Sequence, residues 1–143
     1  MAVAMAAALE SALATNVTAP LVLTDLFCRA FPDAGIARRV INVSSGAAQS
    51  PIAGSSAYCA AKAALEMLTR ALAREAGPEG IRANALCPGP VNTPLLKELF
   101  AKDAERAARR LVHVPMGRFG EPEEMAAAVL FLASDDSSFM TAN

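Results

Sequence analysis

The stretch Arg39-Val-Ile-Asn-Val43, followed by Ser44-Ser45-Gly46, decides the fold class of this chain. The run is short and β-branched, which predicts a buried strand, and the Ser-, Gly- and Pro-rich residues after it predict a loop. A second such run, Ile81 to Cys87, ends sharply at Pro88-Gly89-Pro90. A long helical pattern lies between the two runs. Strands that alternate with helices predict a parallel α/β sheet, here within a single domain, residues 1–143.

Apolar residues at three- and four-residue spacings predict helices around these strands. The first helix runs from about Leu9 to Cys28, and Pro20 is expected to kink it. A turn is predicted at Pro32-Asp-Ala-Gly35. The other predicted helices are Ser56 to Ala76, closed by Gly77-Pro78, then Pro94 to Leu111, and Pro122 to about Ala133.

The composition excludes several classes of partner. Hydrophobic residues make up 54% of the chain, and 13 basic against 14 acidic side chains leave a net charge of -1. A nucleic-acid or anionic-membrane binder would carry a basic excess. No stretch approaches the roughly 20 uninterrupted apolar residues of a membrane-spanning helix, and the Ala-rich start lacks the basic residues of a secretory leader. We therefore expect a soluble protein that binds neither nucleic acid nor membrane.

The cysteines and the histidine argue against a disulfide framework or a metal site. Cys28, Cys59 and Cys87 are an odd number, widely spaced, and His113 is the single histidine. Neither the Cys-x-x-Cys spacing of a zinc site nor an even cysteine set is present. We predict no metal and a cytoplasmic, reducing compartment.

Tyr58 and Lys62 form the first candidate for chemistry. They are four residues apart on the strongest predicted helix, so their side chains lie one turn apart on one face. A phenol with its usual pKa near 10 is a poor proton donor at neutral pH. An ammonium about 5 Å away stabilises a phenolate by roughly 3 kcal/mol at an effective dielectric near 20, which brings it into the range of a general acid or base.

Ser45 and the Pro88-Gly89-Pro90 turn are predicted to lie near one another. Each follows the carboxyl end of a predicted strand. Open α/β sheets bind ligands at that edge. Two parallel strands are thus expected to place the Ser45 hydroxyl and a tight turn at the same edge of the sheet.

Together these motifs resemble the short-chain dehydrogenase/reductase family. Ser45, thirteen residues before Tyr58, and then Tyr58-Cys-Ala-Ala-Lys62, match its serine and its Tyr-x-x-x-Lys. Asn16 matches its helical asparagine, and Pro88-Gly-Pro-Val-Asn-Thr93 matches its Pro-Gly-x-Val-x-Thr. Gly117 to Glu124 is similar to a common late segment. The resemblance implies a Rossmann-like, doubly wound parallel sheet and NAD(P)-dependent hydride transfer to or from a small carbonyl or alcohol.

The resemblance also implies a role for each matched residue. Tyr58 is the general acid or base, Lys62 holds the nicotinamide ribose and favours the phenolate, and Ser45 hydrogen-bonds the substrate oxygen. Asn16 positions a water that links Lys62 to solvent. The implied cofactor-binding residues are Tyr58, Lys62, Pro88, Gly89, Val91 and Thr93, the cofactor is NAD or NADP, and the family's usual assembly is a homodimer or homotetramer.

The chain departs from the family pattern at both ends. None of its eight glycines lies two residues from another, so the Gly-x-Gly loop that cradles the pyrophosphate is absent. We therefore expect a partial fold without the first βαβ units and the last strand.

Two other functions are weighed. A hydrolase using Ser44 or Ser45 is disfavoured, because no Gly-x-Ser-x-Gly is present and His113, more simply a packed or loop residue, would have to be the base. The alternating charges from Lys97 to Arg110 predict a solvated helix face. The stronger rival is an inactive remnant whose helices, especially those that hold Asn16 and Tyr58, serve only for association.

Overall fold

A computed structural model describes residues 2–32 and 37–143 of the chain. In these residues the sheet contains two parallel strands, β1 (Arg38–Val43) and β2 (Ile81–Leu86), paired from Arg38 with Ile81 to Val43 with Leu86. The predicted partial α/β fold is confirmed. Most of the turn predicted at Pro32–Gly35 lies outside the described residues.

The helices lie close to their predicted positions, with two differences. The predicted helix from Pro94 to Leu111 is two helices, because Asp103 leaves the helical conformation with φ −147° and ψ 80°. The first helix begins at Ala2 and not near Leu9, passes through a π-helical turn at Ala14–Thr18, and continues past Pro20 to Ala30. The α-helices are α1 (Ala2–Leu13), α2 (Ala19–Ala30), α3 (Ser56–Ala76), α4 (Pro94–Lys102), α5 (Ala104–Leu111) and α6 (Pro122–Ala133).

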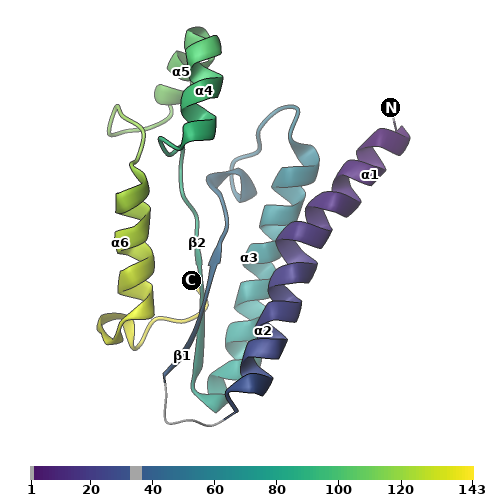
Figure 1. Ribbon diagram of the computed structural model, residues 1–143, viewed down its shortest axis with the longest axis vertical. Helices are drawn as coiled ribbons and strands as arrows, with labels where there is room; N and C mark the ends of the chain where they lie inside the picture. The colour runs from purple at the N-terminus through teal and green to yellow at the C-terminus, as the bar shows by residue number, and fades with distance from the viewer. Residues whose placement is uncertain (1, 33–36) are drawn as a thin grey trace.

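Helices cover the sheet from both sides. Figure 1 shows α3 and the long α1–α2 helix on one side of the strands and α6 on the other. The face that α3 turns inward repeats every four residues, which is the spacing of one helical stripe. Its buried members at that spacing are Ala61, Leu65, Thr69 and Ala73. Ile81 and Ala83 of β2 are also buried, so the core lies between α3 and β2.

The long first helix is apolar and remains largely uncovered. Residues 4–30 are long and apolar enough to cross a membrane, and an 18-residue window within them has a mean hydropathy of 1.3 and no buried residue. The sequence-based expectation counted uninterrupted apolar residues, which Glu10 and Asp25 break. One helix of this kind near a chain start is weak evidence for a membrane span, since core helices and signal sequences share the property.

The end of the chain runs beside β2 on the edge away from β1. Ala142 N donates to Ala83 O at 2.9 Å, and Ala85 N donates to Asn143 O at 2.6 Å. These bonds continue the sheet by a short strand-like segment. The sheet of the described residues still has two strands, in agreement with the expected partial fold without the last strand.

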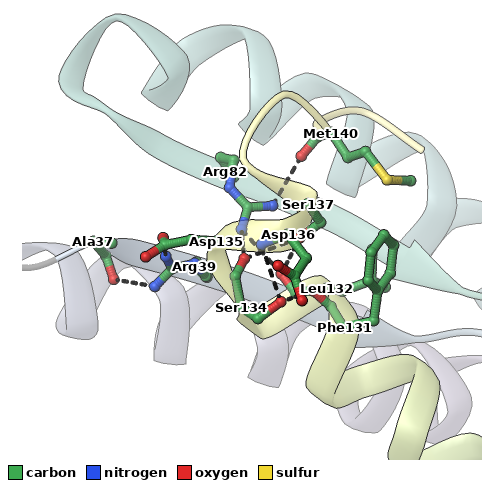
Figure 2. Close-up of polar contacts among 10 residues, drawn as sticks. All are labelled: Ala37, Arg39, Arg82, Phe131, Leu132, Ser134, Asp135, Asp136, Ser137 and Met140. Atoms are coloured by element: carbon green, nitrogen blue, oxygen red, sulfur yellow. Dashed lines mark hydrogen bonds and ion pairs between the residues drawn. The ribbon is translucent and has the colours of Figure 1, made fainter.

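Three arginines, Arg38, Arg39 and Arg82, form an arginine clamp at the amino end of the sheet. Figure 2 shows two of them, Arg39 and Arg82. Arg82 donates to Met140 O at 3.0 Å, to Ser134 O at 3.0 Å and to Leu132 O at 3.1 Å, so it ties β2 to the end of α6. Arg39 pairs with Asp135. Burial lowers the pKa of Arg82, and its strand neighbour Arg39 lowers it further while Asp135 opposes them.

Candidate active site

The carboxyl ends of β1 and β2 bring Ser45 and Pro88 together, as predicted. Ser44 N donates to Leu86 O at 2.7 Å, and Gly46 N donates to Pro88 O at 2.9 Å, so pairing continues past both strands. Ser45 Oγ accepts a hydrogen bond from Ala47 N at 3.2 Å and caps a short 3₁₀ turn, Gly46–Ala48. The serine hydroxyl is thereby fixed at the sheet edge, with its own proton left to donate.

A cavity of about 720 Å³ opens at this edge. Its floor holds the predicted serine and the predicted proline-glycine turn, and its far wall comes from α5 and the turn after it. The volume suits a small organic ligand. The lining residues are Ser45, Gly46, Ala47, Ser50, Pro51, Ile52, Ala53, Pro88, Gly89, Pro90, Arg109, Arg110, His113 and Val114.

Lys62 connects the tyrosine to the strand end. Its Nζ lies 5.8 Å from the centre of the Tyr58 ring and donates to Val43 O at 2.8 Å. Partial burial lowers the pKa of the Lys62 ammonium. One of its three N–H donors is used by Val43, so the others remain for a ligand.

The Tyr58 ring lines a different cavity from the one beside Ser45. This second cavity, of about 510 Å³, lies between α1 and the start of α3. Tyr58 is 40% exposed. The structure therefore forms two pairs, Tyr58 with Lys62 and Ser45 with Pro88, joined through the contact of Lys62 with Val43, two residues before Ser45.

Asn16 lies in the π-helical turn that packs against α3. Its Nδ2 donates to Ala12 O at 2.9 Å. Pro20, four residues later, has no N–H to offer the Asn16 carbonyl, so the usual helical partner of that carbonyl is missing. π-Helical turns are frequent at functional sites for this kind of reason. This backbone oxygen is one the sequence reading did not single out.

Val91 and Thr93 follow the turn and lead into α4. Val91 forms a parallel bridge with Gly120, and Asn92 N donates to Gly120 O at 2.8 Å. Thr93 Oγ1 accepts from Leu96 N at 3.3 Å and so caps α4. A Cβ at Gly89 would meet nothing within 4 Å, so the space beside this turn is open.

A buried carboxylate beneath the site was missed by the sequence reading. Glu66 Oε1 accepts from Ser44 Oγ at 3.2 Å and from Cys87 Sγ at 3.0 Å. Gln49 Nε2 donates to Glu66 Oε2 at 3.4 Å, and Arg70 Nη2 lies 3.9 Å from the same oxygen. A signal was present, because Tyr58, Lys62, Glu66 and Arg70 repeat every four residues. Only the fold shows that the third member of this stripe is buried.

These contacts shift the pKa values of Glu66 and Cys87. Burial raises the pKa of Glu66, but the hydrogen bonds from Cys87, Gln49 and Ser44 outweigh it, and the pKa is lowered overall. Burial and the Glu66 hydrogen bond raise the pKa of the Cys87 thiol to about 11. Cys87 is therefore held as an unreactive thiol donor.

Two arginines and a histidine line the cavity beside Ser45, where the sequence did not predict them. Arg109 and Arg110 were expected on a solvated face, and His113 was expected to be a packed or loop residue. His113 does lie in a turn after α5, yet all three side chains line the cavity beside Ser45. Sequence spacing alone gave no sign of this, because α5 meets the sheet edge only in the fold.

Comparison with known proteins places the chain among reductases. A family model described as Enoyl-(Acyl carrier protein) reductase matches residues 2–143. The L-xylulose reductase of Caenorhabditis elegans is 38% identical over 133 residues, covering 93% of this chain and 53% of that protein. The chain spans about half the length of the curated relatives it matches.

Solved structures agree with the sequence relatives. A structure from Beutenbergia cavernae, named as an NAD(P)-dependent gluconate 5-dehydrogenase with bound NADP, has a TM-score of 0.82 and 37% identity, covering 91% of this chain and 51% of that one. A 4-hydroxyisoleucine dehydrogenase with NADH has a TM-score of 0.77 and 27% identity, covering 89% and 52%. The shared motifs, the family match and the common fold show that this chain belongs to the short-chain dehydrogenase/reductase family.

Proposed function

We propose that this chain carries the proton-transfer residues of an NAD(P)-dependent oxidoreductase that interconverts a small carbonyl compound and its alcohol. The observation that carries the proposal is the position of Lys62, 5.8 Å from the Tyr58 ring centre and hydrogen-bonded to Val43 O at 2.8 Å. This contact anchors the Tyr58–Lys62 pair to the strand end that precedes Ser45. The similarity to NADP- and NADH-bound dehydrogenases supports the same reading.

Each residue has a distinct part in the proposed reaction. The nicotinamide, when bound, supplies the hydride to the carbonyl carbon. Tyr58 donates its phenolic proton to the carbonyl oxygen, and in the reverse direction it accepts the alcohol proton. Ser45 donates a hydrogen bond to the same oxygen, where negative charge develops. Its backbone-fixed hydroxyl needs little reorganisation for this.

The residues present fit the nicotinamide end of the cofactor. Lys62 keeps two donors for ribose hydroxyls, and the open space beside Gly89 admits a close approach to the backbone. Pro88 lines the cavity beside Ser45, and Val91 follows the same turn and is held by its bridge to Gly120. Thr93 keeps its hydroxyl proton while its oxygen caps α4. No glycine-rich phosphate loop occurs in these 143 residues, so these groups serve the nicotinamide end only.

Proton supply to Tyr58 is assigned to Lys62 and Asn16. The Asn16 carbonyl lacks a helical donor at Pro20, and its turn packs on α3, which also carries Lys62. A water held by that carbonyl would pass protons from solvent to the Lys62 ammonium. This route replaces the proton that Tyr58 gives up in each turnover.

A second role, association between copies, is favoured by the uncovered apolar helices. Leu23 is 65% exposed and Leu26 56% on α2, and Met67 is 61% exposed on α3. Exposed apolar surface of this kind is usual at interfaces between subunits. We propose a homodimer or homotetramer, and the inactive association module is the alternative function. The free state of Cys28, Cys59 and Cys87 fits a cytoplasmic location.

Calorimetric titration with NADH and NADPH, combined with turnover by Tyr58→Phe, tests the catalytic proposal. We expect cofactor binding by the wild type, and a loss of turnover of about 100-fold or more in the variant with binding retained. Met67→Leu, an exposed change on the same helix, is the control. If neither cofactor binds, independent catalysis is excluded. Sedimentation of the same sample then decides whether the association module remains.

A further inference from the structure

We propose that the cavity beside Ser45 selects a ketone that also carries an oxyanion, such as a carboxylate or phosphate, and that Arg109 and Arg110 bind this anionic group. The inference rests on the proposed function for the reaction, and it adds the substrate class. The alternative is a neutral sugar or alcohol, which would need no cationic wall.

The charge of the cavity wall is the first argument. Arg109, Arg110 and His113 line it, and none of the described lining residues is acidic. The whole chain has a net charge of -1, so the two adjacent arginines concentrate positive charge locally. Two adjacent guanidinium groups facing a concave surface favour an anion through both charge and hydrogen bonds.

The partners of the two arginines leave them available. Arg109 Nη1 lies 2.8 Å from Glu105 Oε1, but these side chains are 61% and 83% exposed. An exposed pair of this kind contributes little and is readily exchanged for a ligand. The Arg110 guanidinium lies 6.0 Å from the Phe100 ring centre, and that ring stacks on Phe119. The aromatic pair orients the guanidinium without using its hydrogen-bond donors.

The opposite wall suits the other half of such a substrate. Ser45 offers a hydroxyl for the reacting oxygen. The same lining includes apolar residues, among them Pro51, Ile52 and Pro88. A ligand with a carbonyl, a short apolar body and an oxyanion matches these three kinds of lining group.

Substrate preference is the first test, using acetoacetate and its neutral analogue methyl acetoacetate. We expect Arg109→Gln/Arg110→Gln to lower kcat/KM for acetoacetate by about 100-fold, roughly tenfold for each arginine, and to leave methyl acetoacetate nearly unchanged. Arg74→Gln, an exposed arginine in the last turn of α3, is the matched control. Equal losses on both ketones, or no loss on either, would overturn the inference.

Binding without cofactor separates this inference from the proposed function. Acetoacetate and dihydroxyacetone phosphate are titrated into the full chain and followed by amide NMR shifts at Gly46 and Ala53, with methyl acetoacetate and dihydroxyacetone as neutral controls. We expect shifts from an anion only, and weaker binding in the double variant and in high salt. Anion binding without turnover contradicts the proposed function alone. No anion preference in binding contradicts the inference, whatever the turnover, and the two anions distinguish a carboxylate site from a phosphate site.

Discussion

The two ends of the β1–β2 pair are built differently. At the amino end, Arg82 donates to carbonyls at the end of α6 and in the chain after it, and Arg38 donates to Glu79 O, so these bonds join distant parts of the sequence. At the carboxyl end, Ser45 accepts one hydrogen bond and lines the open cavity, and Lys62 donates one hydrogen bond to Val43 O. The contrast teaches that this fold concentrates its stability at one end and its available donors at the other. Substitutions at the two ends should therefore separate stability from ligand binding.

Arg82→Ala should have the largest effect on stability. It removes three hydrogen bonds from a partly buried guanidinium. The three carbonyls then keep one donor each, from Ser137 or Asn84. We expect a loss of about 3 kcal/mol in the free energy of unfolding, measured by urea denaturation. Arg74→Ala is the control, because it removes an exposed arginine of similar size. A loss no larger than that of the control would contradict the stabilising role of the clamp.

Glu66→Ala tests a buried group beneath the carboxyl end of the sheet, where its partners Ser44 and Cys87 directly follow the two strands. The change leaves the Ser44 hydroxyl and the Cys87 thiol without their shared acceptor and opens space under α3. We expect a loss of about 2 kcal/mol in unfolding free energy. Glu75→Ala, which removes an exposed carboxylate on the same helix, is the control.

The same carboxylate predicts a direction for the pH dependence of stability. The pKa of Glu66 is lowered in the folded chain, so the folded state binds its proton less readily than the unfolded state. Its contribution is present above the usual carboxyl pKa of about 4.3 and is lost as the pH falls through the lowered value. Urea midpoints of wild type and Glu66→Gln should converge in acid. Parallel curves from pH 7 to pH 3 would show that Glu66 is not the group responsible.

Lys62→Met should show the opposite balance at the carboxyl end. Only the hydrogen bond to Val43 O is lost within the chain, so we expect a change of about 1 kcal/mol or less in unfolding free energy. NADH binding should weaken by about tenfold or more, because a charge-assisted donor to the ligand is removed. Calorimetry and urea denaturation on the same sample measure both. A large loss of stability here would remove the distinction between the two ends.

The parts of the fold that sequence predicts well are those set by local pattern. Helix α3 begins and ends where its apolar spacing and its Gly77-Pro78 stop predict. The strands are predicted to within a residue because β-branched runs meet turn residues at both ends. The break at Asp103 was missed, because the residues on each side are good helix formers and the pattern gives no stop.

The candidate site is predictable only where one motif follows one strand. The meeting of Ser45 with Pro88 follows from parallel strands ending at one edge, and the structure confirms it. The burial of Glu66 and the approach of Arg109 and Arg110 to the cavity depend on how separate helices pack. A charged residue on a helix carries no local sign of which neighbour will cover it, so these residues read as ordinary surface.

The smallest expected effect on stability is at the start of α6, where Arg118 and Glu124 form an exposed two-point ion pair. Arg118 Nη1 and Nη2 lie 2.8 and 2.6 Å from the carboxylate oxygens, which also accept from Glu121 N at 2.8 Å. The Arg118 hydrogen bonds lower the pKa of Glu124 to about 2.

In Arg118→Gln we expect the pKa of Glu124 to rise towards the usual value of about 4.3, measured by carboxyl ¹³C NMR, with little change in the urea midpoint. Both Arg118 and Arg82 make several hydrogen bonds. Water can replace the donors lost at the exposed Glu124 carboxylate, but it reaches the partly buried carbonyls around Arg82 less easily. If the urea midpoint of Arg118→Gln fell as far as that of Arg82→Ala, burial would not be what decides how much a hydrogen bond stabilises this fold.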